Sequence, residues 1–92
     1  MKADNAKFII KVAGKSSVPS VSGSIIKSVE EGKAVELHSI GASAISQCVK
    51  AMTSARGILA TKGYDVYFIS GFGTTMINNQ EKTMIIFKLI VK

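Results

Sequence analysis

A chain of 92 residues can form one domain with a modest hydrophobic core, but it is too short for two such domains. Hydrophobic residues make up 47% of the sequence and proline occurs once, which argues against an intrinsically disordered protein. The net charge is +6, and all but one of the 12 basic residues are lysine. This favours a polyanionic partner, nucleic acid ahead of an anionic membrane surface, although such a charge can also serve solubility alone.

Three features that the sequence lacks indicate the cellular compartment of the protein: disulfide pairs, a signal peptide and a membrane span. Cys48 is the only cysteine, which excludes an intramolecular disulfide and any metal site built from several cysteines. Residues 1–7 do not resemble a signal peptide, and no stretch reaches the roughly 18 apolar residues that a membrane span needs. We therefore expect a cytoplasmic protein with no membrane span, with residues 1–92 as a single domain and residues 1–6 as a flexible tail.

The first predicted elements are a strand at residues 8–12 and a helix that begins after Ser17. Ser17 is a suitable N-cap, and Pro19 falls in the first turn, where its missing amide hydrogen costs little. Gly32 suits the left-handed residue that ends many helices. Gly23 inside the helix indicates close packing against another element. The apolar residues of this helix recur at helical spacing: Val18, Val21, Ile25 and Val29.

Residues 34–40 predict a half-buried strand, with Val35 and Leu37 facing inward and Glu36 and His38 facing outward. Residues 42–61 predict a long helix, which Gly57 could kink or shorten. Its apolar stripe consists of Ile45, Cys48, Val49, Met52, Ala55 and Leu59, so Cys48 is expected to be a buried hydrophobe. The opposite side carries mostly short side chains, at Ser43, Ser46, Lys50, Thr53 and Ser54. That side either admits a second subunit or merely reflects high helix propensity.

The C-terminal part predicts a strand at residues 64–70, a bulge or bend at residues 71–73, and a further strand segment at residues 74–77. A polar turn at residues 78–80 leads to a final strand at residues 82–91 that is apolar on both faces. Such a strand should be covered on both sides, by a helix on one and by a partner chain as a candidate for the other. The predicted order is β-α-β-α-β-β. This is an α/β chain folded as an α+β two-layer sandwich, with a mixed four-stranded sheet and both helices on one face.

No catalytic or cofactor-binding pattern is complete. Gly14-Lys15-Ser16 resembles the end of a phosphate-binding loop, but Ile9 stands where that loop needs its first glycine. His38 is the only histidine and has no partner for a metal site or for a serine-hydrolase triad. We therefore expect no enzyme activity, no cofactor and no metal. A loop with a lysine, hydroxyls and backbone amides before a helix can still hold a phosphate.

The candidate nucleic-acid contacts lie on two loops, a hairpin turn and the long helix. They are Lys15, Ser16, Ser17, Ser43, Lys50, Arg56, Asn78, Asn79 and Lys82. The two loops follow parallel strands, and ligands of open sheets often bind where such strands end. Arg56, the single arginine, could instead pair with a carboxylate or lie in an interface. The alternative function is an oligomeric structural or regulatory scaffold that acts through protein contacts.

Several segments together resemble the stage V sporulation protein S family, whose members have an Alba-like fold. The matching segments are residues 12–17, 19–21, 23, 40–42, 47, 49–51, 55–57, 72, 77 and 81–83. The resemblance implies an Alba-like β-α-β-α-β-β fold, a homodimer or larger oligomer, binding of DNA or RNA with low sequence specificity, and a regulatory role in sporulation or septation. The chain departs from Alba proteins at Lys15-Ser16, where two adjacent lysines are common, and at residues 39–43, which lack arginine.

Overall fold

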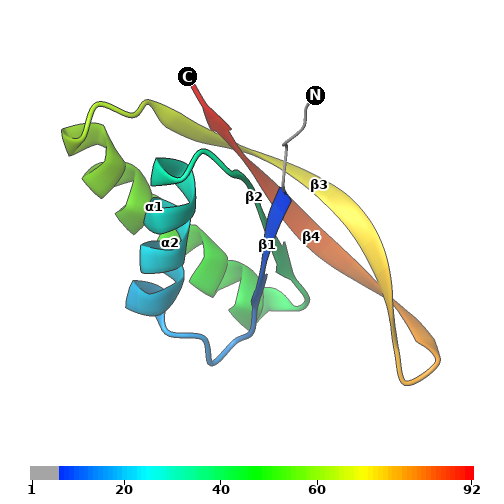
Figure 1. The fold of residues 1–92 in the computed structure, drawn as a ribbon. Coiled ribbons are helices and arrows are strands. Elements are labelled where there is room, and N and C mark those ends of the chain that lie inside the picture. Colours follow the sequence, from blue (N-terminus) through cyan, green and yellow to red (C-terminus); the bar gives the residue numbers. More distant parts are fainter. Residues whose placement is uncertain (1–6) are drawn as a thin grey trace, which may run out of the picture.

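The computed structural model describes residues 7–92, so the flexible tail expected at residues 1–6 lies outside the described residues. Six elements follow one another in the predicted order (Figure 1). They are β1 (Lys7–Val12), α1 (Val18–Glu30), β2 (Ala34–Ser39), α2 (Ala42–Thr61), β3 (Val66–Ile77) and β4 (Gln80–Val91). None of the helices in this part of the chain is long and apolar enough to cross a membrane.

The four strands form one mixed sheet in the order β1-β2-β4-β3. β1 and β2 are parallel, and β4 pairs antiparallel with β2 on one side and β3 on the other. Both helices cover the same face of this sheet, as predicted (Figure 1). The other face, which we call the open face, carries no helix. The α+β two-layer sandwich expected from the sequence is therefore confirmed.

The core lies between the helices and the covered face of the sheet. Its fully buried large side chains come from α1, β2, α2 and β3: Ile25, Leu37, Leu59, Val35 and Val66. The Ser17 hydroxyl caps α1 by accepting a hydrogen bond from the backbone N–H of Ser20 at 3.3 Å, and Gly32 ends this region with a φ of 75°. These observations confirm the predicted start and end of α1.

The long helix α2 has the predicted bounds and continues through Gly57 without ending. Its buried stripe is rotated slightly from the predicted one, because Ala44 and Ala51 are buried whereas Val49 remains 46% exposed. Cys48 is fully buried, as expected. Small alanine side chains on this stripe let α2 lie close to its neighbours, and larger apolar residues are left at the margin.

The packing differs from the sequence-based picture at three positions. Of the bulge or bend predicted at residues 71–73, the bulge is absent, because β3 pairs with β4 in one continuous register from Val66 to Ile77; Figure 1 shows β3 curving along its length instead. Gly23 makes no close approach, since a methyl group built there would meet no atom within 4 Å. The outward-facing Glu36 is only 8% exposed, because neighbouring side chains on the open face surround it. The alternation of apolar and polar residues along a strand predicts which face of the sheet a side chain lies on. It does not predict how densely neighbouring side chains cover that side chain.

The β3–β4 hairpin extends well beyond β1 and β2 (Figure 1). β2 pairs with β4 only as far as Ile85, so residues 73–84, which we call the hairpin arm, have no other strand beside them. The predicted coverage of β4 by a helix is found, because Leu89 is buried under the helices. Ile86 on the open face is only half-buried within residues 7–92, and coverage of that side by a partner chain stays a prediction.

Candidate nucleic-acid interface

The loop between β1 and α1 is held by its own serines. The Ser16 hydroxyl accepts a hydrogen bond from the backbone N–H of Ala13 at 2.8 Å, and the Ser16 N–H donates to the Ala13 carbonyl at 3.0 Å. Gln47 on α2 donates from Nε2 to the Ser16 carbonyl at 2.8 Å and ties the loop to the second helix. Ser16 and Ser17 thus shape the loop, and Lys15 is the exposed cation that the loop presents.

The turn before α2 lies against this loop. Gly41 is the N-cap of α2 and has a φ of 91°, a conformation that favours glycine. The side chain of Ser43 packs so close to Gly14 that a methyl group added to Gly14 would overlap it. The starts of α1 and α2 therefore lie together at the ends of β1 and β2. Neither helix has an acidic residue in its first turn, so the positive ends of both helix dipoles remain uncompensated there.

The hairpin arm ends in a two-residue turn at Asn78 and Asn79, whose φ angles are 52° and 62°. Two consecutive residues with positive φ are typical of the tight turn that matches strand twist, and asparagine tolerates this conformation. Lys82 is exposed and lies opposite Thr75 in the β3–β4 register. The described part of the chain contains no ion pair that involves Lys82.

Lys50 and Arg56 lie farther along α2 from these loops. With a rise of about 1.5 Å per residue, Lys50 lies roughly 12 Å and Arg56 roughly 21 Å from Ala42 along the helix axis. Arg56 donates a hydrogen bond from Nε to the Val66 carbonyl at 3.1 Å, which fastens α2 to the start of β3. The structure thus brings together the first loop, Ser43 and the hairpin arm, but it does not bring Arg56 to them.

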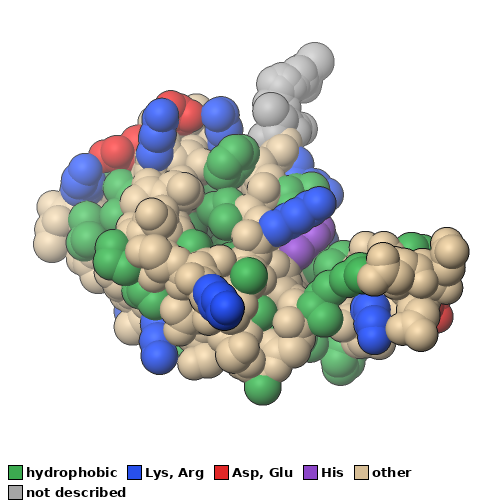
Figure 2. Space-filling view, turned by 90° about the horizontal axis from the view of Figure 1, so that it is seen from below, with side chains coloured by type: hydrophobic (Ala, Val, Ile, Leu, Met, Phe, Trp, Pro, Cys, Tyr) green, Lys and Arg blue, Asp and Glu red, His purple; other side chains and the backbone are tan. Residues whose placement is uncertain are grey.

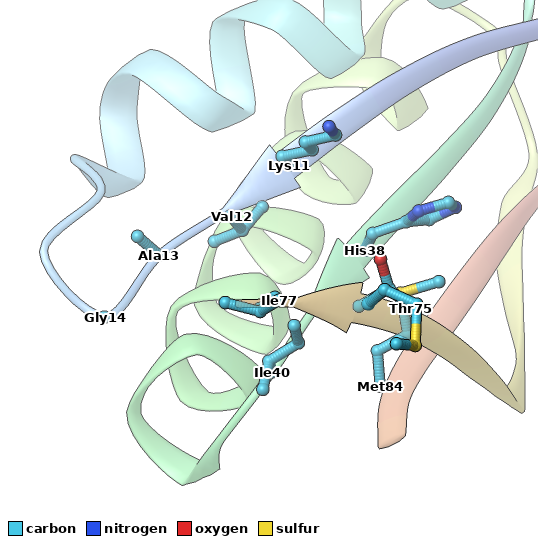
Figure 3. Close-up of a pocket in the computed structure, with 10 residues that line it drawn as sticks. Lys11, Val12, Ala13, Gly14, His38, Ile40, Thr75, Ile77 and Met84 are labelled. Carbon is cyan, nitrogen blue, oxygen red and sulfur yellow. The ribbon is translucent and has the colours of Figure 1, made fainter. Parts of the chain in front are cut away.

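A cavity of about 460 Å³ separates the first loop from the hairpin arm. Figure 3 shows ten residues around it, from the ends of β1 and β2 and from the arm, and Figure 2 shows the single histidine, in purple, in a hollow beside the projecting arm. The lining residues are Lys11, Val12, Ala13, Gly14, His38, Ile40, Thr75, Met76, Ile77 and Met84. The sequence interpretation missed this cavity, because its walls come from segments about 60 residues apart whose meeting no local pattern encodes.

Lys11 and His38 stand side by side on the open face, because they are register partners in β1 and β2. Glu36 Oε1 accepts a hydrogen bond from His38 Nε2 at 3.0 Å, and Glu36 Oε2 pairs with Lys7 Nζ at 3.2 Å. The hydrogen bond from His38, followed by the hydrogen bond and charge of Lys7, holds the pKa of Glu36 below its ordinary value. The Glu36 carboxylate is therefore already engaged, and none of the residues among 7–92 that line the cavity is acidic.

The described residues offer little for catalysis. Within residues 7–92 no group of three or more histidine, cysteine, aspartate or glutamate side chains is placed to hold a metal ion. Burial raises the pKa of the Cys48 thiol, which keeps it protonated and unreactive. What the geometry does provide is an edge with exposed hydroxyls, an exposed lysine and the positive ends of two helix dipoles, and such an edge can bind anions.

Comparison with known proteins agrees with the fold just described. The family model for stage V sporulation protein S matches residues 8–92. Among solved structures, Alba from Thermoplasma volcanium is similar with a TM-score of 0.61 at 13% sequence identity, over 92% of this chain and 99% of that chain. At this identity the likeness shows the fold alone, and it confirms the predicted Alba-like architecture. Because the family model spans nearly the whole sequence, the chain belongs to the stage V sporulation protein S family.

Proposed function

We propose that this protein is a non-enzymatic nucleic-acid-binding protein that contacts the phosphate backbone of DNA or RNA with little sequence preference. The observation that carries the proposal is the meeting of the first loop and the hairpin arm on either side of one hollow, whose lining residues in the described part of the chain include no acid. Lys15 on the loop and Lys82 on the arm are both exposed. A polyanionic strand that spans the hollow can be bound by both lysines and by the positive ends of α1 and α2.

The charge distribution supports backbone contacts over base-specific ones. The only arginine, Arg56, is bonded to the Val66 carbonyl, so the planar group best suited to reading guanine is not presented at this edge. Lysine acts as a point charge that neutralises phosphates and releases counterions. The family resemblance adds the expectation of a regulatory role in sporulation or septation, which we include in the proposal.

The experiment is a binding titration of single-stranded and duplex nucleic acid with the parent protein at several salt concentrations. The Lys15→Ala and Lys82→Ala variants should each weaken binding by a similar factor for all sequences, and each should make the salt dependence shallower by roughly one unit. Lys27→Ala removes the same charge near the opposite end of α1 and serves as the matched control. If the parent shows no salt-dependent binding, or if all three variants match it, the proposal is wrong.

A second candidate function rests on the exposed apolar surface. Phe72 at the base of the hairpin arm is 83% exposed, Met76 is 64% exposed and Ile69 is 53% exposed. Such residues on a small protein indicate an interface, and we propose a homodimer or a larger oligomer that could act as a scaffold for protein partners.

Light scattering at high micromolar concentration tests this assembly. Ile86 lies on the open face and Phe87 on the covered face, as their register partners His38 and Leu37 indicate. Ile86→Asp should therefore reduce the oligomer while leaving the chain folded, whereas Phe87→Asp should unfold it, because a buried unpaired charge costs several kcal/mol. A parent protein that remains a monomer would contradict the scaffold proposal.

A further inference from the structure

The cavity between the first loop and the hairpin arm has a composition that phosphate binding alone does not require. Its volume of about 460 Å³ falls in the range of roughly 300–1,000 Å³ that is usual for small-molecule sites. Aliphatic and thioether side chains make up much of the wall: Val12, Ile40, Met76, Ile77 and Met84. Ile40, Met76 and Ile77 remain 40%, 64% and 42% exposed, so apolar surface faces the solvent here.

The polar groups of the cavity are placed at its open-face side. Lys11 and His38 project from paired positions of β1 and β2 (Figure 3), and Thr75 adds a hydroxyl from the arm. His38 is oriented by its hydrogen bond to Glu36, and its side chain is only 17% exposed. No ion pair within residues 7–92 involves Lys11, so its charge is available to a ligand.

We propose that this cavity receives one unpaired base of a single-stranded nucleic acid, with the adjoining phosphate near Lys11. A base is flat, aromatic and attached to an anion, which matches an apolar wall beside a cation. Imidazole rings stack on bases, and polarizable thioethers make favourable contacts with aromatic rings. The inference rests on the proposed function, because it places the base of a strand whose phosphates are held on either side by Lys15 and Lys82.

The cavity distinguishes single strands from duplexes. A paired base is stacked inside its helix, and extruding it costs a few kcal/mol, whereas a base of a single strand turns outward at little cost. A protein that only neutralised phosphates would instead bind a strand without bases as well as a natural strand.

The test compares three probes of about 12 nucleotides, a natural single strand, the same strand with every base removed, and the duplex, by fluorescence anisotropy at two salt concentrations. The abasic strand keeps all its phosphates, so its salt-dependent binding tests the proposed function separately. The natural strand should bind the parent about tenfold more tightly than the abasic strand. Equal binding of these two strands would overturn the base pocket while leaving backbone binding intact.

Variants locate the effect within the cavity. Met84→Ala should reduce the preference for the natural strand about threefold. Ile77→Ala should reduce it similarly, and because Ile77 is 42% exposed this variant should remain folded. Ile58→Ala changes an isoleucine of nearly the same exposure as Ile77, but on α2 and outside the cavity, and should leave the preference unchanged. A preference that survives both cavity variants would overturn the assignment, as would displacement of the natural strand by a medium-chain fatty acid but not by a mononucleotide.

Discussion

The two ends of the β3–β4 hairpin show how differently one pair of strands can be used. At the Val66 and Leu89 end, the hairpin is buried under α1 and α2, and these two residues are 1% and 8% exposed. In the hairpin arm, Met76 lies on the same face of the hairpin as Val66, but it is 64% exposed because neither helix reaches that far. Apolar patterning therefore stabilises the fold in the body, whereas in the arm it leaves a surface that is free to bind.

The largest expected contrast is between a core residue of the body and an apolar residue at the base of the arm. Leu37 is fully buried in β2, so Leu37→Ala should lower the free energy of unfolding by about 2–5 kcal/mol. Phe72→Ala removes a larger side chain but should change it by about 0.5 kcal/mol or less. Urea denaturation at a low protein concentration, where association is minimal, measures both values. Equal losses would show that the arm is packed against something in the folded monomer.

A smaller effect is expected at Cys48, which is fully buried in α2. Cys48→Ala should lower the free energy of unfolding by about 1 kcal/mol and leave nucleic-acid binding unchanged, because the residue belongs to the body. Thiol labelling of the native protein should be slow, since burial both shields the sulfur and raises the pKa of its thiol. Rapid labelling under native conditions would contradict this placement.

Substitutions in the turn of the hairpin arm should act only through the backbone conformation that each residue type prefers. Asn79 has a φ of 62°, so Asn79→Ala should destabilise the hairpin by roughly 1 kcal/mol or less, whereas Asn79→Gly should be tolerated. Hydrogen exchange of the arm amides is the measurement. Faster exchange confined to residues 73–84 is expected, while body amides keep their protection. If body amides also lost protection, the arm and the body would unfold as one unit.

The smallest expected effect is on how stability depends on pH. It concerns the open face of the body, where Glu36 pairs with Lys7 and His38. The pKa of Glu36 is lowered in the folded state, so its ionised form contributes stability above the ordinary pKa of 4.5, and this contribution is lost as the pH falls through the lowered value. Glu36→Gln should therefore be less stable than the parent at pH 7 and nearly equal to it in acid. A difference that did not change with pH would assign the effect to packing.

Much of the fold is predictable from local chemistry. The Ser17 cap, the left-handed Gly32 and the bounds of α2 all follow from residue types at fixed spacings, because caps and helical periodicity act over a few residues. The candidate site is only half predictable by this route. Lys15 stands out as a cation in a loop and Lys82 as a cation beside a hairpin turn, but no local sequence pattern predicts the hydrogen bond from Gln47 to the first loop.

What the sequence determined alone is the set of elements, their inward faces and the overall positive charge. Only the tertiary structure decided that β4 lies between β2 and β3, that the arm projects past the body, and that Lys11 and His38 share a cavity with Met84. The physical reason is the separation along the chain of the residues that interact. Periodicity and capping depend on neighbours along the chain, whereas strand order and the walls of a cavity depend on contacts between segments that the chain brings together only when the core forms.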